Sequence, residues 1–167
     1  SIVVVPHYVF QPQKSMKDTK TIQSNSVEET QKLAESLAKE IITEPSNKGA
    51  FIIALHGELG AGKTSFAQGV AKGLGIEERV LSPTFIVVKE FPISKKNSFS
   101  NLIHIDCYRL EKSKDLLDLG WSGMISDPSN IILVEWAEKV KDILPEDTRD
   151  IHLSFIDETT REIQLSD

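Results

Sequence analysis

A short run of residues in the first half of the chain has the composition and spacing of a phosphate-binding loop. Glycines let the backbone turn tightly and approach a ligand, and successive N–H groups that open a helix form an anion site. The lysine would bring a positive charge to the β- and γ-phosphates, and the threonine hydroxyl would ligate Mg²⁺. The run, which predicts binding of a nucleoside triphosphate with Mg²⁺, consists of Gly57, Glu58, Leu59, Gly60, Ala61, Gly62, Lys63 and Thr64.

The segments on either side of this run are those that such a loop needs. Residues 51–55 are continuously apolar and have the length of a buried strand. Residues 65–74 have helical spacing, with Phe66, Val70 and Leu74 four apart, and Gly75 is placed to end the helix. A phosphate-binding loop lies between a strand and a helix, so these flanking segments support the prediction made from the loop residues.

Two acidic residues could complete a magnesium-dependent site. Asp106 follows residues 102–105 of a predicted strand, and Glu135 follows the apolar segment 131–134. Open α/β sheets gather their ligands at the carboxyl ends of their strands, and a triphosphate site with Mg²⁺ needs a carboxylate there. One carboxylate would orient a Mg²⁺-bound water, and the other would orient the attacking water or complete the metal shell. The sequence leaves open which residue does which.

Three further residues have two interpretations each. Thr84, after Ser82 and the stiffening Pro83, could sense a γ-phosphate or could mark an ordinary junction between loop and strand. Trp136 could border the nucleotide or pack in the core. His104 is expected to be a packed or surface residue of its strand rather than a base.

A helix is expected from Ser26 to about residue 41. Ser26 with Glu29 three residues later forms a capping-box pattern, and Pro45 ends the segment. The residues expected to line one face of this helix are Val27, Leu33, Leu37, Ala38 and Ile41.

The order of elements predicts an α/β fold. A continuous β-branched run at 131–134 is typical of a central parallel strand. We expect a three-layer P-loop NTPase fold, with a parallel central sheet and antiparallel strands added at its edges. The other expected elements are strands at 19–23, 85–91, 101–106, 150–156 and 162–165, a short helix at 112–119, and a loop or helical turn at 120–123.

Composition limits the class of protein. At 167 residues and 40% hydrophobic content, one domain is expected over 20–167, preceded by an extension at 1–19. No apolar run reaches membrane-spanning length, and the start lacks the features of a signal peptide. The single cysteine, Cys107, is expected to be a packing residue and fits a reducing compartment, so a cytoplasmic location is expected.

The charge balance argues against tight binding of nucleic acid by this chain alone. Asp and Glu number 25 and Lys and Arg number 19, which gives a net charge of −6. Backbone binding requires several phosphates to be neutralised by Lys or Arg. Any contact with nucleic acid is therefore expected to be indirect.

Four motifs in order and with matching spacing resemble the TsaE (YjeE) family, the bacterial ATPase subunit of the machinery that forms threonylcarbamoyladenosine in tRNA. The glycine loop alone is shared by many families, whereas the set is specific, and the resemblance spans roughly residues 20–166. The motifs are Gly57–Thr64, Ser82–Phe85, His104–Leu110 and Val134–Glu138.

The resemblance implies hydrolysis of ATP to ADP and phosphate, in support of two partner proteins, TsaB and TsaD. It implies contact with tRNA only through that complex, and no membrane. It assigns phosphate and Mg²⁺ roles to Lys63 and Thr64 and acidic roles to Asp106 and Glu135. The remaining family positions are a switch-like loop at Thr84, a tryptophan bordering the site at Trp136, and Ser65, where a second threonine is frequent.

Three other functions stay open at this stage. A small-molecule kinase would need arginines that clamp the transferred phosphate, and the four arginines here are scattered. A GTPase is disfavoured because neither an Asp-x-x-Gly switch after the loop nor an Asn-Lys-x-Asp motif occurs. A nucleotide-gated binding module, in which ATP sets partner affinity, overlaps with the family interpretation.

Overall fold

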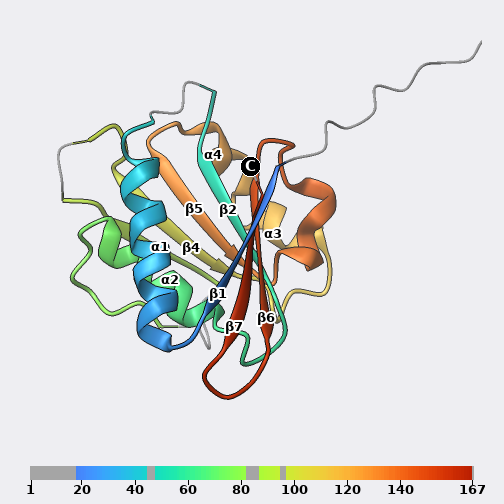
Figure 1. Ribbon diagram of the computed structural model, residues 1–167. Helices are drawn as coiled ribbons and strands as arrows, with labels where there is room; N and C mark the ends of the chain where they lie inside the picture. The colour runs from blue at the N-terminus through green and yellow to red at the C-terminus, as the bar shows by residue number, and fades with distance from the viewer. Residues whose placement is uncertain (1–17, 45–47, 82–86, 95–96, 167) are drawn as a thin grey trace, which may run out of the picture.

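The chain is built around one mixed β-sheet. The computed structural model describes residues 18–44, 48–81, 87–94 and 97–166. The strands lie side by side in the order β1-β7-β6-β2-β5-β4-β3 (Figure 1). They are β1 (Thr19–Ser24), β2 (Phe51–His56), β3 (Val88–Pro92), β4 (Asn101–Asp106), β5 (Asn130–Glu135), β6 (Arg149–Phe155) and β7 (Arg161–Ser166).

The centre of the sheet is parallel and its edges are antiparallel. Strands β6, β2, β5 and β4 run in one direction. Strand β7 pairs antiparallel with β6 and then with β1, and β3 pairs antiparallel with β4. The predicted fold class is thus confirmed. Because the parallel strands share one direction, the residues that follow β2, β4 and β5 all lie at the same edge of the sheet.

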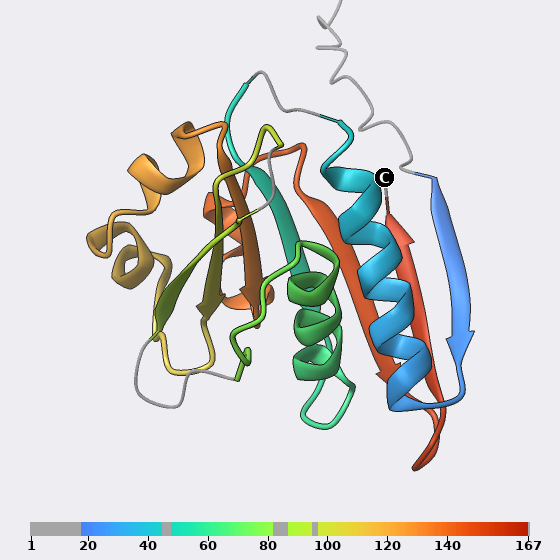
Figure 2. The same ribbon diagram turned by 90° about the vertical axis from the view of Figure 1, so that its left-hand side faces the viewer.

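Helices cover both faces of the sheet (Figures 1 and 2). One face carries α1 (Val27–Ile41) and α2 (Lys63–Gly73), whose apolar side chains belong to one core cluster. The other face carries α3 (Ser113–Asp118), α4 (Trp121–Ser126) and the 3₁₀ segment η1 (Ala137–Ile143), which contribute to a second cluster. The sheet separates the two clusters, which makes three layers.

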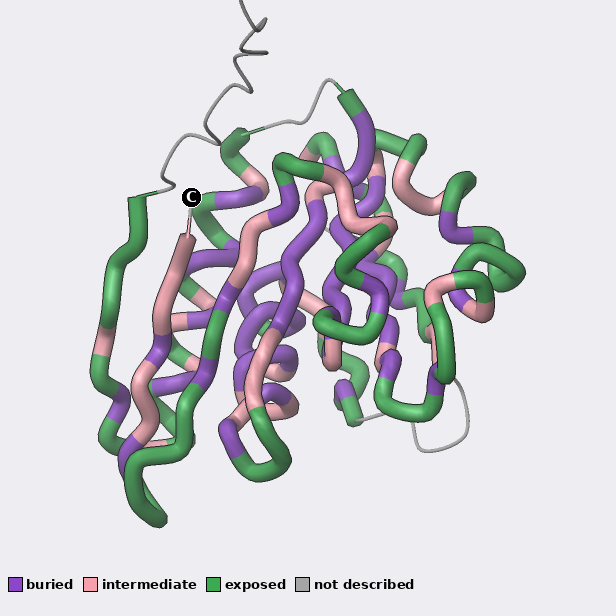
Figure 3. The backbone as a smooth tube through the Cα atoms, turned by 90° about the vertical axis from the view of Figure 1, so that its right-hand side faces the viewer, coloured by how far each residue is buried: buried purple, intermediate pink, exposed green. Residues whose placement is uncertain are grey.

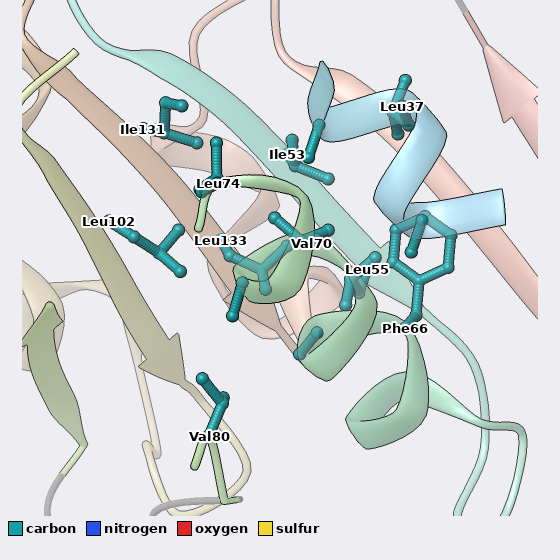
Figure 4. Close-up of a cluster of buried hydrophobic side chains, with 14 of the residues drawn as sticks. Leu37, Ile53, Leu55, Phe66, Val70, Leu74, Val80, Leu102, Ile131 and Leu133 are labelled. Carbon is teal, nitrogen blue, oxygen red and sulfur yellow. The ribbon is translucent and has the colours of Figure 1, made fainter. Parts of the chain in front are cut away.

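Alternation along the strands divides the core between these layers. In β2, Ile53 and Leu55 pack towards α1 and α2, whereas Ile52 and Ala54 pack towards the opposite layer. Figure 4 shows Leu55 beside Phe66 of α2. The central strands are mostly buried, while β1 at the edge is mostly exposed (Figure 3). Each fully buried Leu, Ile or Phe side chain contributes about 1.5–3 kcal/mol to folding.

Two glycines bring α1 and α2 close together. A Cβ at Gly69 would lie 2.4 Å from the carbonyl oxygen of Gln31, and one at Gly73 would lie 2.5 Å from that of Glu35. Neither position can accept a side chain without separating the helices. The two small residues therefore set how tightly the helix that begins at the phosphate loop is packed.

The start of α1 agrees with the sequence prediction, but one side chain does not. Ser26 caps the helix, its Oγ accepting from the Glu29 N–H at 3.0 Å, and the Glu29 carboxylate accepts from the Asn25 N–H at 2.7 Å. Val27 was expected on one face with Leu37 and Ile41, which are buried, but Val27 itself is 55% exposed. As the first residue of the helix, Val27 lies at the rim of a cavity beside Ser65 instead.

The remaining elements lie close to the positions predicted from the sequence. The strand expected at 85–91 begins at Val88, and residues 85–86 lie outside the described part of the chain. The segment 120–123, left open between loop and helix, opens α4. The hairpin of β6 and β7 is confirmed. Most of the extension expected at 1–19 lies outside the described residues, and Thr19 already belongs to β1.

Candidate nucleotide-binding site

The loop between β2 and α2 depends on its glycines. Gly60 and Gly62 have φ values of 81° and 101°, in the left-handed region that favours glycine. A Cβ at Gly57 would lie 2.5 Å from the carbonyl oxygen of Leu153 on β6. The first glycine therefore permits close approach to the neighbouring strand, and the later two permit the turn into α2.

Lys63 lies under the loop rather than in solvent. Its side chain is 6% exposed, and its Nζ donates to the carbonyl oxygens of Gly57 at 2.5 Å and Glu58 at 2.8 Å. Burial lowers the pKa of Lys63, and the nearby carboxylates, Glu135 foremost among them, oppose this shift. The ammonium group is thus held against the backbone of the loop, among acidic side chains.

The two predicted carboxylates are neighbours. Asp106 and Glu135 are register partners at the ends of the parallel strands β4 and β5. Burial raises the pKa of Asp106, and the neighbouring Glu135 raises it further. The backbone N–H of Tyr108 donates to the Asp106 carboxylate at 2.9 Å and lowers this pKa. Two acidic groups therefore stand side by side at the edge of the sheet where β2 enters the phosphate loop.

Glu135 has a partner that sequence reasoning did not identify. The His104 Nε2 lies 2.6 Å from the Glu135 Oε2, and the two side chains are only 1% and 2% exposed. Of the two positions expected for His104, packed or on the surface of its strand, the structure shows the packed one, but the sequence did not reveal the pairing with Glu135. A signal existed, because residues two apart on a strand share a face, which puts His104 on the same side of β4 as Asp106.

Trp136 contacts both the site and the core. It has a left-handed φ of 56°, an unusual conformation for a tryptophan, and it directly follows Glu135. The Lys63 Nζ lies 4.2 Å from the centre of its ring, and the ring of Tyr108 lies 5.1 Å away, tilted by 48°. Part of Trp136 also packs against the second core cluster. The alternative that Trp136 packs in the core is therefore confirmed in part, and its role in bordering the nucleotide stays a prediction.

The chain is similar to proteins of a known family. Residues 24–163 match the family model described as threonylcarbamoyl adenosine biosynthesis protein TsaE. The chain belongs to the TsaE family.

Individual relatives agree with this assignment. Two of them are named tRNA threonylcarbamoyladenosine biosynthesis protein TsaE. The protein from Aquifex aeolicus is 36% identical, and the match covers 90% of this chain and 98% of that protein. The protein from Bacillus subtilis is 37% identical, and the match covers 75% of each chain. The crystal structure of Bacillus subtilis YdiB superposes with a TM-score of 0.63 at 28% identity, covering 90% of this chain and 86% of that one. The match to YdiB extends the similarity from sequence to tertiary structure.

The side chains of this TsaE family member suit magnesium in particular. Thr64 and Ser65 lie half-buried in the first turn of α2, and Asp106 and Glu135 add carboxylate oxygens. In the described part of the chain, no three His, Cys, Asp or Glu residues form a group that could hold a metal by themselves. Mg²⁺ is usually held by one or two carboxylates together with phosphate oxygens and water, so the donor set fits a metal that arrives with a nucleotide.

The structure tests the sequence prediction for Cys107 but not the one for Thr84. Thr84 lies outside the described residues, so its predicted role stays a prediction. Cys107 is confirmed as a packing residue, because it is fully buried and burial raises its pKa to about 12. Within the described ranges, no helix has the length and apolar character needed to cross a bilayer.

Proposed function

We propose that this chain hydrolyses ATP to ADP and phosphate in a Mg²⁺-dependent reaction, and that it does so for threonylcarbamoyl modification of the adenosine next to the anticodon in tRNA. The observation that supports the proposal best is the meeting of Lys63, Asp106 and Glu135 at one edge of the sheet, in a member of the TsaE family. In this proposal residues 20–167 act as one ATPase domain in the cytoplasm.

Nucleotide binding would use the loop as it stands. The backbone N–H groups of 57–64 would receive the phosphates at the N-terminus of α2. Lys63 now donates to two carbonyl oxygens of the loop, and it would exchange these partners for β- and γ-phosphate oxygens. Because the lysine is already positioned and largely desolvated, little side-chain ordering remains for the nucleotide to impose.

Thr64 and one of the two carboxylates would hold Mg²⁺, which, when bound, neutralises charge on the phosphates. The other carboxylate would orient the attacking water. Glu135 is held in place by His104, and Asp106 by the Tyr108 N–H, so both acceptors are oriented before a ligand arrives. Thr84 is proposed to sense the γ-phosphate, and Trp136 to border the bound phosphates.

The proposed partners are proteins of the TsaB and TsaD type, with tRNA reached through them. The net charge of −6 supports indirect contact, since cations hold a nucleic-acid backbone and acidic residues outnumber basic ones in this chain. Turnover by the isolated chain is expected to be slow and to accelerate when the partner complex is added.

Phosphate release from ATP and Mg²⁺, with no acceptor present, tests the enzyme class. Lys63→Ala is expected to lose nucleotide binding, whereas Asp106→Asn and Glu135→Gln are expected to lower turnover on the order of 100-fold with a smaller effect on binding. Lys72→Ala, an exposed lysine on the same helix, is the matched control and should behave like the wild type. Turnover that requires an added metabolite, or a preference for GTP over ATP, would contradict the proposal.

A reconstituted modification assay tests the biological role. The chain, the TsaB–TsaD pair, tRNA and the threonylcarbamoyl donor are combined, and formation of the modified adenosine is measured. Lys63→Ala should fail to support modification. Normal modification with this variant would show that nucleotide handling by this chain is dispensable.

A further inference from the structure

A group of ionisable side chains outside the candidate site surrounds His56, the last residue of β2 before the phosphate loop. His56 and its register partner His152 on β6 alternate with residues that pack towards α1 and α2, so both rings lie on the opposite face of the sheet. Two cavities, of about 350 and 400 Å³, are each lined by both histidines. The end of β2 is therefore accessible to water and to protons.

Both ring nitrogens of His56 face a carboxylate. Its Nε2 lies 2.8 Å from the Asp150 Oδ1, and its Nδ1 lies 3.6 Å from the Glu138 Oε2. A neutral imidazole has one N–H, so it can donate to only one of these groups, and its other nitrogen turns a lone pair towards a carboxylate oxygen. The imidazolium has two N–H groups and suits both neighbours. The geometry therefore fits His56 in its protonated form.

His152 does not share this charge. Its ring stacks on that of His56, with 4.4 Å between the ring centres and 13° between the ring planes. Burial lowers the pKa of His152, and the charge of His56 lowers it further, against the opposing effects of Asp150 and Glu138. Because a second positive charge is disfavoured in the stack, the pair holds one proton, on the ring that lies between the two carboxylates.

Other charged side chains around the two rings come from the phosphate loop, from η1 and from the segment between η1 and β6. They are Glu58, Lys141 and Glu146. Together with Asp150 and Glu138, carboxylates outnumber ammonium groups among the described residues that line the two cavities. The surroundings as a whole are thus acidic and can neutralise one positive charge.

Glu138 connects this group of side chains to the phosphate loop. It belongs to η1, which directly follows Trp136, and the Lys63 Nζ lies 4.2 Å from the centre of the Trp136 ring. Burial lowers the pKa of Lys63, and Glu135 and then Glu138 act against that shift, so the Glu138 carboxylate lies within electrostatic reach of the lysine. Without a counter-charge, Glu138 would attract the lysine and repel incoming phosphates. The His56 imidazolium reduces both effects.

We propose that His56 is a positioning residue for nucleotide binding, whose imidazolium pairs with Glu138 and so leaves Lys63 to the phosphates. The proposal rests on the proposed nucleotide-binding function and adds a link between that function and proton binding. Histidine changes its charge between about pH 5 and pH 8. Affinity for nucleotide is therefore highest where His56 is protonated, and it falls as rising pH removes the proton.

The test compares a titratable, a neutral and a permanently charged side chain at position 56. Binding of ADP with saturating Mg²⁺ is measured by titration calorimetry at about pH 6 and about pH 8. His56→Gln is neutral at both values, whereas His56→Arg keeps a positive charge and several N–H donors. His152→Gln, on the facing ring of the stack, is the matched control. Thermal unfolding at each pH confirms that each variant folds.

We expect the ratio of wild-type affinity to His56→Gln affinity to be on the order of fivefold larger at about pH 6 than at about pH 8. Protonation of ADP itself cancels in this ratio, because it affects both proteins equally. His56→Arg should match the wild type at the lower pH and exceed it at the higher pH. His152→Gln should keep the wild-type pH dependence.

Calorimetry in two buffers of different ionisation enthalpy gives a second measurement, the number of protons taken up when ADP binds. This number should be larger for the wild type than for His56→Gln. The inference is overturned, while the proposed function stands, if pH dependence and proton uptake are the same in these two proteins. It is also overturned if the pH dependence disappears only in His152→Gln, or if His56→Gln and His56→Arg weaken binding equally at both pH values. If the wild type binds no ADP at either pH, the proposed function itself fails.

Discussion

The buried pair of His104 and Glu135 allows a quantitative test of how the site is held together. The two side chains are 1% and 2% exposed, and their Nε2 and Oε2 atoms lie 2.6 Å apart. Replacing His104 by leucine would leave the Glu135 carboxylate buried without its partner. Leaving a buried carboxylate without its hydrogen-bond partner is strongly destabilising, by about 3 kcal/mol or more, so His104→Leu should lower the free energy of unfolding by about that amount.

Replacing both His104 and Glu135 should lower the free energy of unfolding much less than replacing His104 alone. Apolar groups of similar shape in place of both partners leave no unsatisfied charge, and such replacements are often nearly neutral. The double variant His104→Leu/Glu135→Met is therefore expected to lie within about 1 kcal/mol of the wild type. The same logic predicts a fall in melting temperature of roughly 6–12 °C for the single variant, at about 2–4 °C for each kcal/mol.

Urea unfolding at neutral pH, without nucleotide or metal, measures these differences. Ile105→Val, a change to a fully buried side chain on the same strand, is the control for loss of packing and should cost about 0.5–1.5 kcal/mol. A single-variant cost below about 1 kcal/mol would refute the argument. A double variant as unstable as the sum of the two single variants would also refute it, because the pair would then show no coupling.

Three more predictions follow from the described contacts. Gly69→Ala places a Cβ against the Gln31 carbonyl and should lower stability in urea by about 1–3 kcal/mol; unchanged stability would mean that α1 and α2 can separate freely. Burial raises the Asp106 pKa, so the folded chain holds this proton more tightly than the unfolded chain does. Wild-type stability should therefore fall relative to Asp106→Asn as pH rises from 3.8 through the raised pKa, and a pH-independent difference would contradict this. Cys107, buried and with a pKa of about 12, should react with a thiol reagent at pH 8 on the order of 100-fold slower in the folded chain than in urea; comparable rates would show that it is accessible.

Local sequence determined the elements that carry the site. The phosphate loop could be predicted because its glycines, lysine and threonine are contiguous and because the strand before it and the helix after it have their own periodicities. The Ser26 cap was equally local. Val27 could not be placed in the same way, because helical periodicity assigns a face but does not say where the neighbouring layer ends.

The tertiary structure decided which side chains meet. Asp106 and Glu135 became neighbours because β4 and β5 are adjacent and parallel in a register that aligns their last residues. Sequence could suggest two carboxylates but not this alignment, since strand order and register depend on packing between segments far apart in the chain. The same holds for the pairing of His104 with Glu135, for the position of Lys63 over the ring of Trp136, and for the position of His56 between Asp150 and Glu138. Each of these contacts joins residues from different elements, so it exists only once the two layers of helices have closed on the sheet.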